Sequence, residues 1–450
     1  MIEGVLAHVL VSSHCASLES KIQSETMQPV LSTLPNGASL LRVPMPAVAS
    51  VTVLALVNAG RRYEPEKWAG ISHFIEHMVF KGTQNFANSQ ELSAEIDNVG
   101  GGFNAFTSKE YTGYYVRLAS RYLDTALHVV SDMLCTPQLR QEDITREAQV
   151  IREEINMYED MPMRRIGDVY DELLFEGNLE GSVLGQKETI SALTRDDFVE
   201  YINNWYGFSN VVFVVAGDEK VVGDEALVEK VETALAKGGA DRQAQDHQPF
   251  WSGNGYGQDK KRIISKETEQ AHFVLGMPSF ARNDERRYAL SLLSTLLGRT
   301  MSSRLFTEIR DKRGLCYYVR SNTDFYHDAG SFDVAAGVDP HRIEEAITAT
   351  KQEILQVIGE QPVTEQELQG AKQNMIGGLL LELEDTQSVA YWYGLKYLLE
   401  GKVETEKEVI QKLEKVSLNE VNQVAKDLIR EDQFRLALIG SFKPEDITSI

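Results

Sequence analysis

Residues 70–81 have the sequence GISHFIEHMVFK, which contains the motif His-x-x-Glu-His. If this stretch is a helix, His73 and His77 lie one turn apart on one face, where two imidazoles can bind one metal ion, and Glu76 shares their side. The apolar residues fall on the opposite side, so they would pack on a core and turn the His/Glu face toward a cleft. A catalytic zinc site needs a third protein ligand and an open position for water. Without that third ligand, the motif is only the solvated face of an amphipathic helix.

A second helix, predicted from Glu142 to Tyr158, offers candidates for the third ligand. Its apolar residues recur at helical spacing. Glu147 and Glu154 fall within the same stripe, whereas Glu153 points about 100° away from Glu154 on an ideal helix. A carboxylate that faces a core is costly unless it is paired, protonated or bound to a metal. Two interpretations remain open: these carboxylates pair with basic residues such as Arg152, or they belong to a metal site.

Between the two helices, three glycines at 100–102 precede a short segment with β character. The segment comprises Phe103, Asn104, Ala105, Phe106 and Thr107. Glycines permit close backbone approach, and the following run from Tyr111 to Leu118 is strongly β-like. The segment is therefore either one strand of a plain hairpin or a strand that pairs with an extended peptide.

The chain repeats itself after residues 236–258, whose Gly- and Gln-rich composition without periodicity is typical of a linker. The run 194–217, which ends VVFVVAG, corresponds to 417–440, which ends FRLALIG, at an offset of 223 residues. A second match, which begins at Pro137 and Pro362, has an offset of 225 residues. Two matches at nearly one offset predict a duplicated α+β domain.

The second copy lacks the candidate metal ligands. Lys372 and Leu379 occupy the positions that correspond to Glu147 and Glu154, and no His-x-x-Glu-His follows the linker. We therefore divide the chain into an extension expected to be disordered (1–27), an N-terminal domain that carries the motif (28–235), the linker (236–258) and a homologous C-terminal domain without metal ligands (259–450).

Composition narrows the class of protein. The net charge of −22 over 450 residues argues against nucleic acid, whose phosphates need basic patches, and favours basic peptides or proteins as ligands. No run approaches the roughly 18 apolar residues that span a bilayer, so no membrane span is expected. Three widely spaced cysteines are typical of a reducing compartment. Because no targeting segment is recognisable, we expect a cytoplasmic, bacterial protein.

These residues and their spacing resemble the pitrilysin/insulinase-type inverted-zincin peptidases, whose signature is the His-x-x-Glu-His order. The similarity extends over nearly the whole chain from about residue 28. It is greatest to the short members, typified by the mitochondrial processing peptidase β subunit and its bacterial homologues. The resemblance implies an α+β fold of two duplicated domains, each an antiparallel-rich sheet covered by helices, which together form a two-halved clamshell.

The resemblance also implies an activity, that of a zinc-dependent endopeptidase that hydrolyses peptides or unfolded protein segments. One Zn²⁺ per chain would be bound by His73, His77 and Glu154, in the zinc-binding peptidase domain. Glu76 would be the general base, and Glu147 would support the site from behind a ligand.

Residues outside the metal site receive roles from the same resemblance. Arg310 and Tyr317 of the second half would stabilise the oxyanion. Phe103, Asn104, Ala105 and Thr107 would lie on the strand that pairs with the substrate backbone. The sequence departs from the bacterial pattern at Arg299-Thr300, where relatives often have glycines, and it lacks the glycine-rich loop of the α-type partner subunit.

Two alternatives accompany this hypothesis. One chain carries both the zinc half and the Arg/Tyr half, so we expect a homodimer; a heterodimer with a non-catalytic paralogue is the other assembly. The rival function is a non-catalytic scaffold or a peptide-binding subunit of a larger complex. Retention of Glu76 together with the three candidate ligands argues against that rival.

Overall fold

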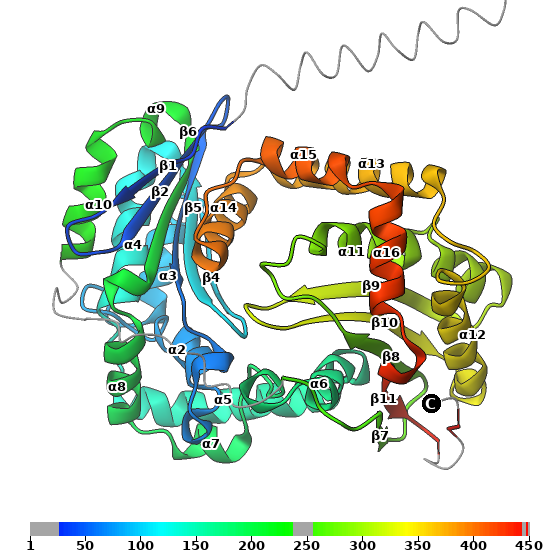
Figure 1. The fold of residues 1–450 in the computed structure, drawn as a ribbon. Helices are drawn as coiled ribbons and strands as arrows, with labels where there is room; N and C mark the ends of the chain where they lie inside the picture. The colour runs from blue at the N-terminus through cyan, green and yellow to red at the C-terminus, as the bar shows by residue number, and fades with distance from the viewer. Residues whose placement is uncertain (1–26, 237–254, 443–446, 449–450) are drawn as a thin grey trace, which may run out of the picture.

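Two β-sheets, each flanked by helices, form the two halves of the molecule (Figure 1). This computed structural model describes residues 27–236, 255–442 and 447–448. The expected extension (1–27) lies outside the described residues except for residue 27, and the expected linker (236–258) except for residues 236 and 255–258. Within those ranges, no helix combines the length and the hydrophobicity that crossing a bilayer requires.

The first sheet has six strands in the order β1-β2-β6-β3-β5-β4, in which the β2–β6 pair is parallel and the other pairs are antiparallel. Its strands are β1 (Val30–Thr33), β2 (Ser39–Met45), β3 (Ser50–Val57), β4 (Gly102–Thr107), β5 (Thr112–Ala119) and β6 (Val211–Asp218). The central strand β3 is almost entirely apolar because both of its faces are covered. Val53 faces the core that includes α4 (Leu123–Cys135), and Leu54 faces α14 (Thr386–Glu400).

The second sheet repeats the topology of the first with five strands in the order β7-β11-β8-β10-β9. They are β7 (Lys261–Ser265), β8 (Ala271–Pro278), β9 (Cys316–Phe325), β10 (Gly330–Val338) and β11 (Arg435–Gly440). This order corresponds to β2-β6-β3-β5-β4 of the first sheet. The β7–β11 pair is parallel, as is β2–β6, and the other pairs in both series are antiparallel. The predicted duplicated α+β fold is confirmed.

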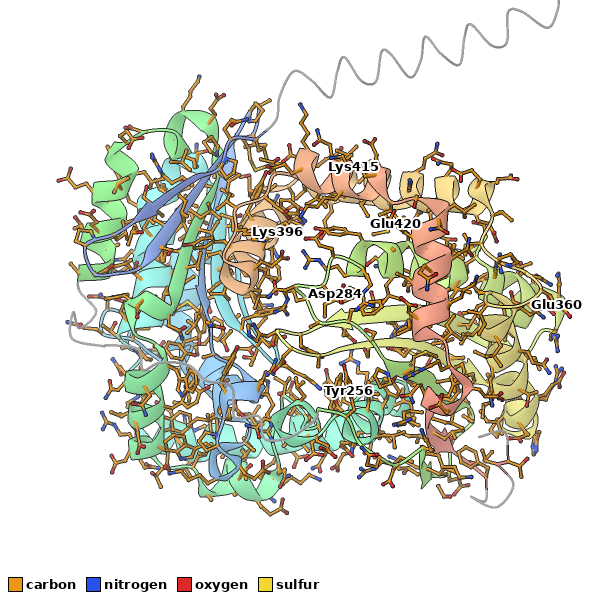
Figure 2. The ribbon with its side chains drawn as sticks, in the orientation of Figure 1. Tyr256, Asp284, Glu360, Lys396, Lys415 and Glu420 are labelled. Carbon is orange, nitrogen blue, oxygen red and sulfur yellow. The ribbon has the colours of Figure 1, made fainter. Side chains whose placement is uncertain are left out.

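The two halves exchange helices. Helix α6 (Pro162–Leu174) belongs to the first half in sequence, but it packs on β8 and β11 of the second sheet. Helix α14 belongs to the second half and packs on β2, β3 and β6 of the first sheet. The end of α14 is held by its own half, because Arg287 pairs with Glu400 at 2.7 Å and Lys396, labelled in Figure 2, pairs with Glu404 at 2.6 Å. Each sheet therefore depends on the other half for one covering layer.

The remaining helices complete the two cores. In the first half they are α2 (Ile71–Met78), α3 (Ser89–Asp97), α5 (Gln141–Glu159), α7 (Lys187–Ala192), α8 (Arg195–Trp205), α9 (Glu219–Val222) and α10 (Ala226–Ala236). In the second half they are α11 (Arg287–Ser294), α12 (Ile343–Gln356), α13 (Glu365–Glu382), α15 (Glu406–Lys415) and α16 (Leu418–Leu428), with two π-helical segments, η6 (Thr295–Arg299) and η7 (Phe306–Lys312).

The two helices predicted around the His-x-x-Glu-His motif are α2 and α5, and they contact each other. Helix α2 also contacts the edge strand β4. The apolar stripe of α5 is buried through Ile144, Ile151 and Ile155, and Glu147 lies in the same stripe with only 4% of its surface exposed. The contact between α2 and α5 therefore brings the motif next to carboxylates of α5.

Candidate metal centre

Helix α2 is fixed at its N-terminus by the buried carboxylate of Glu64. Glu64 accepts hydrogen bonds from the backbone N–H groups of Gly70 (2.7 Å) and Ser72 (2.8 Å). An anionic group at this end also complements the helix dipole. Burial raises the pKa of Glu64, against the charge of Arg61 and these hydrogen bonds. The sequence analysis did not identify Glu64, because it lies in a polar connection six residues before Gly70, outside any capping spacing.

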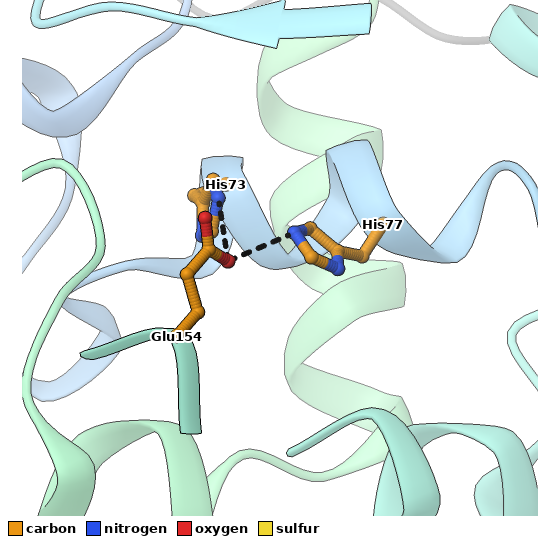
Figure 3. A group of neighbouring side chains, drawn as sticks. All are labelled: His73, His77 and Glu154. Carbon is orange, nitrogen blue, oxygen red and sulfur yellow. Dashed lines mark ion pairs between the residues drawn. The ribbon is translucent and has the colours of Figure 1, made fainter. Parts of the chain in front are cut away.

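The side chains of His73, His77 and Glu154 converge on one point (Figure 3). One ligand atom from each lies within 4.8 Å of the other two. Glu154 Oε2 is 3.7 Å from His73 Nε2 and 3.4 Å from His77 Nε2. Ligand atoms about 2.0–2.2 Å from a tetrahedral zinc ion lie about 3.4 Å from one another. Two imidazole nitrogens and one carboxylate oxygen at these separations fit a zinc ion.

Behind His77, a chain of polar contacts leads away from the convergent atoms. Glu147 Oε1 lies 2.9 Å from His77 Nδ1, and Glu147 Oε2 lies 2.6 Å from Lys81 Nζ. In a neutral His77, a proton on Nδ1 that is donated to Glu147 leaves the Nε2 lone pair available to a metal ion. Lys81 lies four residues after His77, just beyond the end of α2, and was not identified from the sequence, although this spacing is a usable signal.

The two imidazoles differ in their electrostatic surroundings. Burial, together with the charge of His77, lowers the pKa of His73 to about 4. Burial would also lower the pKa of His77, but hydrogen bonds and negative charges from Glu147 and Glu154 outweigh it and raise that pKa to about 9. The hydrogen bond with His77 in turn lowers the pKa of Glu154. The cluster therefore has a neutral imidazole beside a position where two carboxylates favour a positive charge.

Glu76 is set apart from the three converging side chains by a hydrogen bond to the edge strand. Thr107 Oγ1 of β4 donates to Glu76 Oε2 at 2.7 Å. Burial raises the pKa of Glu76, against this hydrogen bond and the charge of His77. From the second half, Tyr391 of α14 contacts Phe106 of β4 with ring centroids 4.5 Å apart, a contact that the sequence did not predict.

Strand β4 is the outer strand of the first sheet and pairs with β5 along one edge. Within the described chain, no other strand pairs with its outer edge. Asn104 is exposed and Ala105 is buried, while Phe103 is half-buried against Phe80 with ring centroids 5.7 Å apart. The structure therefore places the expected substrate strand beside Glu76 with one free edge.

Arg310 and Tyr317 lie next to each other in the second half. The Arg310 guanidinium is 5.7 Å from the centroid of the Tyr317 ring, which is 75% exposed. Tyr317 lines a cavity of about 950 Å³ between α6 and the second sheet, and Tyr158, one turn beyond Glu154 on α5, lines it as well. Among the described residues, no hydrogen bond, ion pair or ring contact joins Arg310 or Tyr317 to the three converging side chains. The structure brings the ligand candidates together but keeps the Arg/Tyr pair on the other half.

Comparison with known proteins places this architecture in a family. Residues 44–187 match the family described as "Insulinase (Peptidase family M16)", and residues 192–375 match "Peptidase M16 inactive domain". An "uncharacterized zinc protease" from Streptomyces coelicolor is 35% identical over 422 residues, which cover 93% of this chain and 91% of that relative. The chain belongs to the insulinase family, peptidase family M16. The zinc protease YmxG from Bacillus subtilis, also described as uncharacterized, is 34% identical to this chain over 410 residues. These residues cover 91% of this chain and 97% of YmxG.

Solved structures share the fold of this insulinase-family chain. A protease from Helicobacter pylori superposes with a TM-score of 0.81 at 22% identity, covering 92% of this chain and all (100%) of that one. A structure described as the peptidase M16 inactive domain from Pseudomonas fluorescens superposes with a TM-score of 0.82 at 18% identity. The superposition covers 92% of this chain and 98% of that one. The resemblance inferred from the sequence is confirmed, as is the two-domain fold.

Proposed function

We propose that this chain is a zinc-dependent endopeptidase that hydrolyses peptides or unfolded protein segments. The observation that carries the proposal is the convergence of His73, His77 and Glu154 within 4.8 Å, next to a separately held carboxylate, Glu76. The relatives named zinc proteases support the same class of activity. One zinc ion per chain would be bound by the two Nε2 atoms and a Glu154 oxygen. When bound, zinc would supply Lewis acidity that makes water nucleophilic near neutral pH.

The residues around this site have complementary tasks in the proposed mechanism. Glu76 accepts the proton of the attacking water and later delivers it to the leaving amine. Thr107 holds the Glu76 carboxylate in place through its 2.7 Å hydrogen bond. Glu147 fixes the orientation of His77, and Lys81 balances the charge of Glu147.

The substrate would bind between the halves. An extended peptide would add to the free edge of β4 through backbone hydrogen bonds at Phe103, Asn104 and Ala105. Arg310 and Tyr317 would approach the scissile carbonyl from the second half and stabilise the developing oxyanion. Because these two side chains do not touch the ligand cluster in the described structure, this role requires the substrate, or a closer approach of the halves, to connect them.

The decisive test is cleavage of a mixed peptide library by the full chain before chelation, after chelation and after zinc is restored. We expect chelator-sensitive cleavage that zinc restores. Glu76→Gln should abolish turnover and keep one zinc per chain, while Glu153→Gln, an exposed glutamate of α5 beside Glu154, should behave as wild type. One bound zinc without any cleavage by the wild-type chain would instead support the scaffold or peptide-binding alternative.

The proposed assembly is a homodimer, because one chain carries both the ligand cluster and the Arg/Tyr pair. Light scattering of the purified chain should give twice the mass of 50.5 kDa. A monomer that becomes active only with a co-purified paralogue would favour the heterodimer.

A further inference from the structure

Strand β9 contains one residue more than its partner at the point where Tyr317 lies. Gly337 of β10 faces Tyr318, and the next residue, Val338, faces Cys316. Tyr317 therefore has no residue opposite it. This two-against-one arrangement is a β-bulge, a feature that re-aims side chains and is frequent near active sites.

The burial of the neighbouring residues shows how the bulge redirects the strand. In a regular strand, Cys316 and Tyr318 would share a face because side chains alternate. Here Cys316 packs with Val319 against the core of the second half, whereas Tyr318 packs on the opposite face, which α6 covers. As a result, the consecutive residues Tyr317 and Tyr318 both line the same cavity. A strand without the extra residue could not present both.

Tyr318 is the fixed member of this pair. Its hydroxyl lies 3.0 Å from His272 Nδ1, and the two rings stack with an interplanar angle of 27°. Gly337, which lies between them on β10, provides the space. A Cβ at Gly337 would come within 2.5 Å of the Tyr318 ring and 3.2 Å of the His272 ring. The glycine, the histidine and the tyrosine thus form one packing unit across three strands.

A second irregularity lies on the other side of Tyr317. Arg310 belongs to the π-helical segment η7, and widened turns of this kind are frequent at functional sites. Its guanidinium stacks 4.6 Å from the Phe306 ring and 5.7 Å from the Tyr317 ring. The corresponding pair in the first sheet, β4 with β5, is in continuous register. The bulge is therefore a feature of the second half, where the proposed oxyanion residues lie.

From these contacts we infer that Tyr318, His272 and Gly337 are positioning residues for Tyr317. They fix the backbone of the bulge, so that the exposed Tyr317 ring projects into the cavity beside Arg310. The catalytic purpose of this arrangement rests on the proposed peptidase function, whereas the positioning of Tyr317 by these three residues does not depend on it. Because 75% of Tyr317 is exposed, its direction is set by the backbone and by its neighbour more than by packing of its own ring.

The direct test places 3-fluorotyrosine at position 317 of the full chain and records its ¹⁹F spectrum. Tyr318→Phe removes one hydroxyl and Gly337→Ala adds the clashing Cβ. We expect each to shift or broaden the resonance of residue 317, with no change for the control Tyr122→Phe, which alters a half-buried tyrosine on the first half. An unchanged resonance in Tyr318→Phe and Gly337→Ala, both folded by circular dichroism, overturns the inference whatever the activity.

Kinetics provide the second readout. Loss of one oxyanion donor typically costs about 10²–10³-fold in kcat, so indirect loss through Tyr318→Phe is expected to cost about 10-fold, with KM within about 2-fold. In the Tyr317→Phe variant, adding Tyr318→Phe should lower kcat no further. If the two substitutions instead lower kcat by the product of their separate effects, Tyr318 does not act through Tyr317. His272→Gln, which keeps a hydrogen-bonding group, should retain more activity than His272→Leu.

The two hypotheses fail in different ways. If Tyr317→Phe leaves kcat unchanged while the ¹⁹F resonance still responds to Tyr318→Phe, the catalytic role of Tyr317 is wrong and the positioning inference is supported. If the zinc test shows no cleavage at all, the ¹⁹F experiment still decides whether the bulge is held by Tyr318 and Gly337.

Discussion

The two halves have the same order of equivalent strands, but they differ in the polar residues that their matching helices carry. On α5 of the first half, Glu147 contacts His77 and Lys81, and Glu154 contacts both histidines. On α13 of the second half, the corresponding Lys372 is buried and donates to the backbone oxygen of Glu414 at 2.7 Å. One helix of the duplicated pair thus carries the carboxylates of the candidate metal site, whereas the other uses the position that corresponds to Glu147 for a structural contact.

A second difference concerns how inward-facing carboxylates are compensated. In the first half, hydrogen bonds from His77 and Lys81 outweigh burial and lower the pKa of Glu147. In the second half, Asp333 of β10 accepts a hydrogen bond from Asn322 and is 5% exposed. Burial and the charge of Asp324 raise the pKa of Asp333 to about 7. Glu147 of the candidate metal site thus has a basic neighbour in Lys81, while Asp333 accepts its hydrogen bond from an amide.

Exchanging residues between the two helices should have the largest effect. Glu154→Leu gives α5 the residue that α13 has, and removes one of three ligands. We expect more than about 100-fold weaker zinc binding and cleavage at background. Metal analysis after dialysis and peptide cleavage measure both. Leu381→Glu on α13, at a leucine that is 70% exposed, is the control and should change neither.

Glu147→Lys should weaken the site less, because it removes a supporting group and leaves the three ligands. The new cation would lie against His77 and Lys81, which Glu147 now bridges. Supporting residues of this kind are worth about 10–100-fold in metal affinity. Zinc titration against a competing chelator measures the change. Equal losses in Glu147→Lys and in Glu153→Lys, an exposed site on the same helix, would mean that general charge is the cause.

A smaller effect, on stability, is expected where a helix of the second half meets the first sheet. A Cβ at Gly394 of α14 would lie 2.8 Å from Leu56 and 2.8 Å from Val214. Gly394→Ala should therefore lower the free energy of unfolding by about 1 kcal/mol or more through overpacking. Gly377→Ala on α13, where no atom lies within 4 Å, should be neutral or stabilising by about 0.5–1 kcal/mol. Thermal melting of both variants makes the comparison, and similar shifts would argue against close packing at Gly394.

The last expected effect, confined to one residue of the second sheet, is a pH dependence of stability. The folded-state pKa of Asp333, about 7, lies above the ordinary value of about 3.9. Between these values the folded protein keeps a proton that the unfolded chain releases, so this residue's contribution to stability falls as pH rises and levels off above pH 7. Asp333→Asn should therefore gain about 2–3 kcal/mol relative to wild type between pH 5 and pH 8. Urea unfolding at both pH values tests this, and a constant difference would contradict it.

The sequence predicted features that depend on short periodic patterns. Helical spacing predicted that His73 and His77 share one face and that Glu147 and Glu154 lie in one stripe, but only the structure shows that the two sets face each other. The repeat offset predicted the duplication that the two strand orders confirm. By contrast, Glu64 and Thr107 reach the site from a connection and from a strand edge, where no periodicity identifies a contact.

Features that depend on long-range pairing were not predictable in this way. The bulge at Tyr317 is defined by its register with β10, and a single strand's sequence does not state that register. The exchange of α6 and α14 depends on which sheet leaves a face open, a property of the assembled halves. The sequence placed Arg310 and Tyr317 near each other along the chain, but their separation from the ligand cluster is a tertiary property.

The exchanged helix α14 also has a consequence for synthesis of the chain on the ribosome. The last strand of the first sheet ends at Asp218, and α14 begins 168 residues later, at Thr386. At about 5–20 residues per second, the sheet waits on the order of 10–30 s for its cover. During that interval the apolar face that includes Leu54, Leu56 and Val214 is exposed on the nascent chain. A chaperone that binds exposed apolar strands is the expected companion of this protein until residues 386–400 emerge.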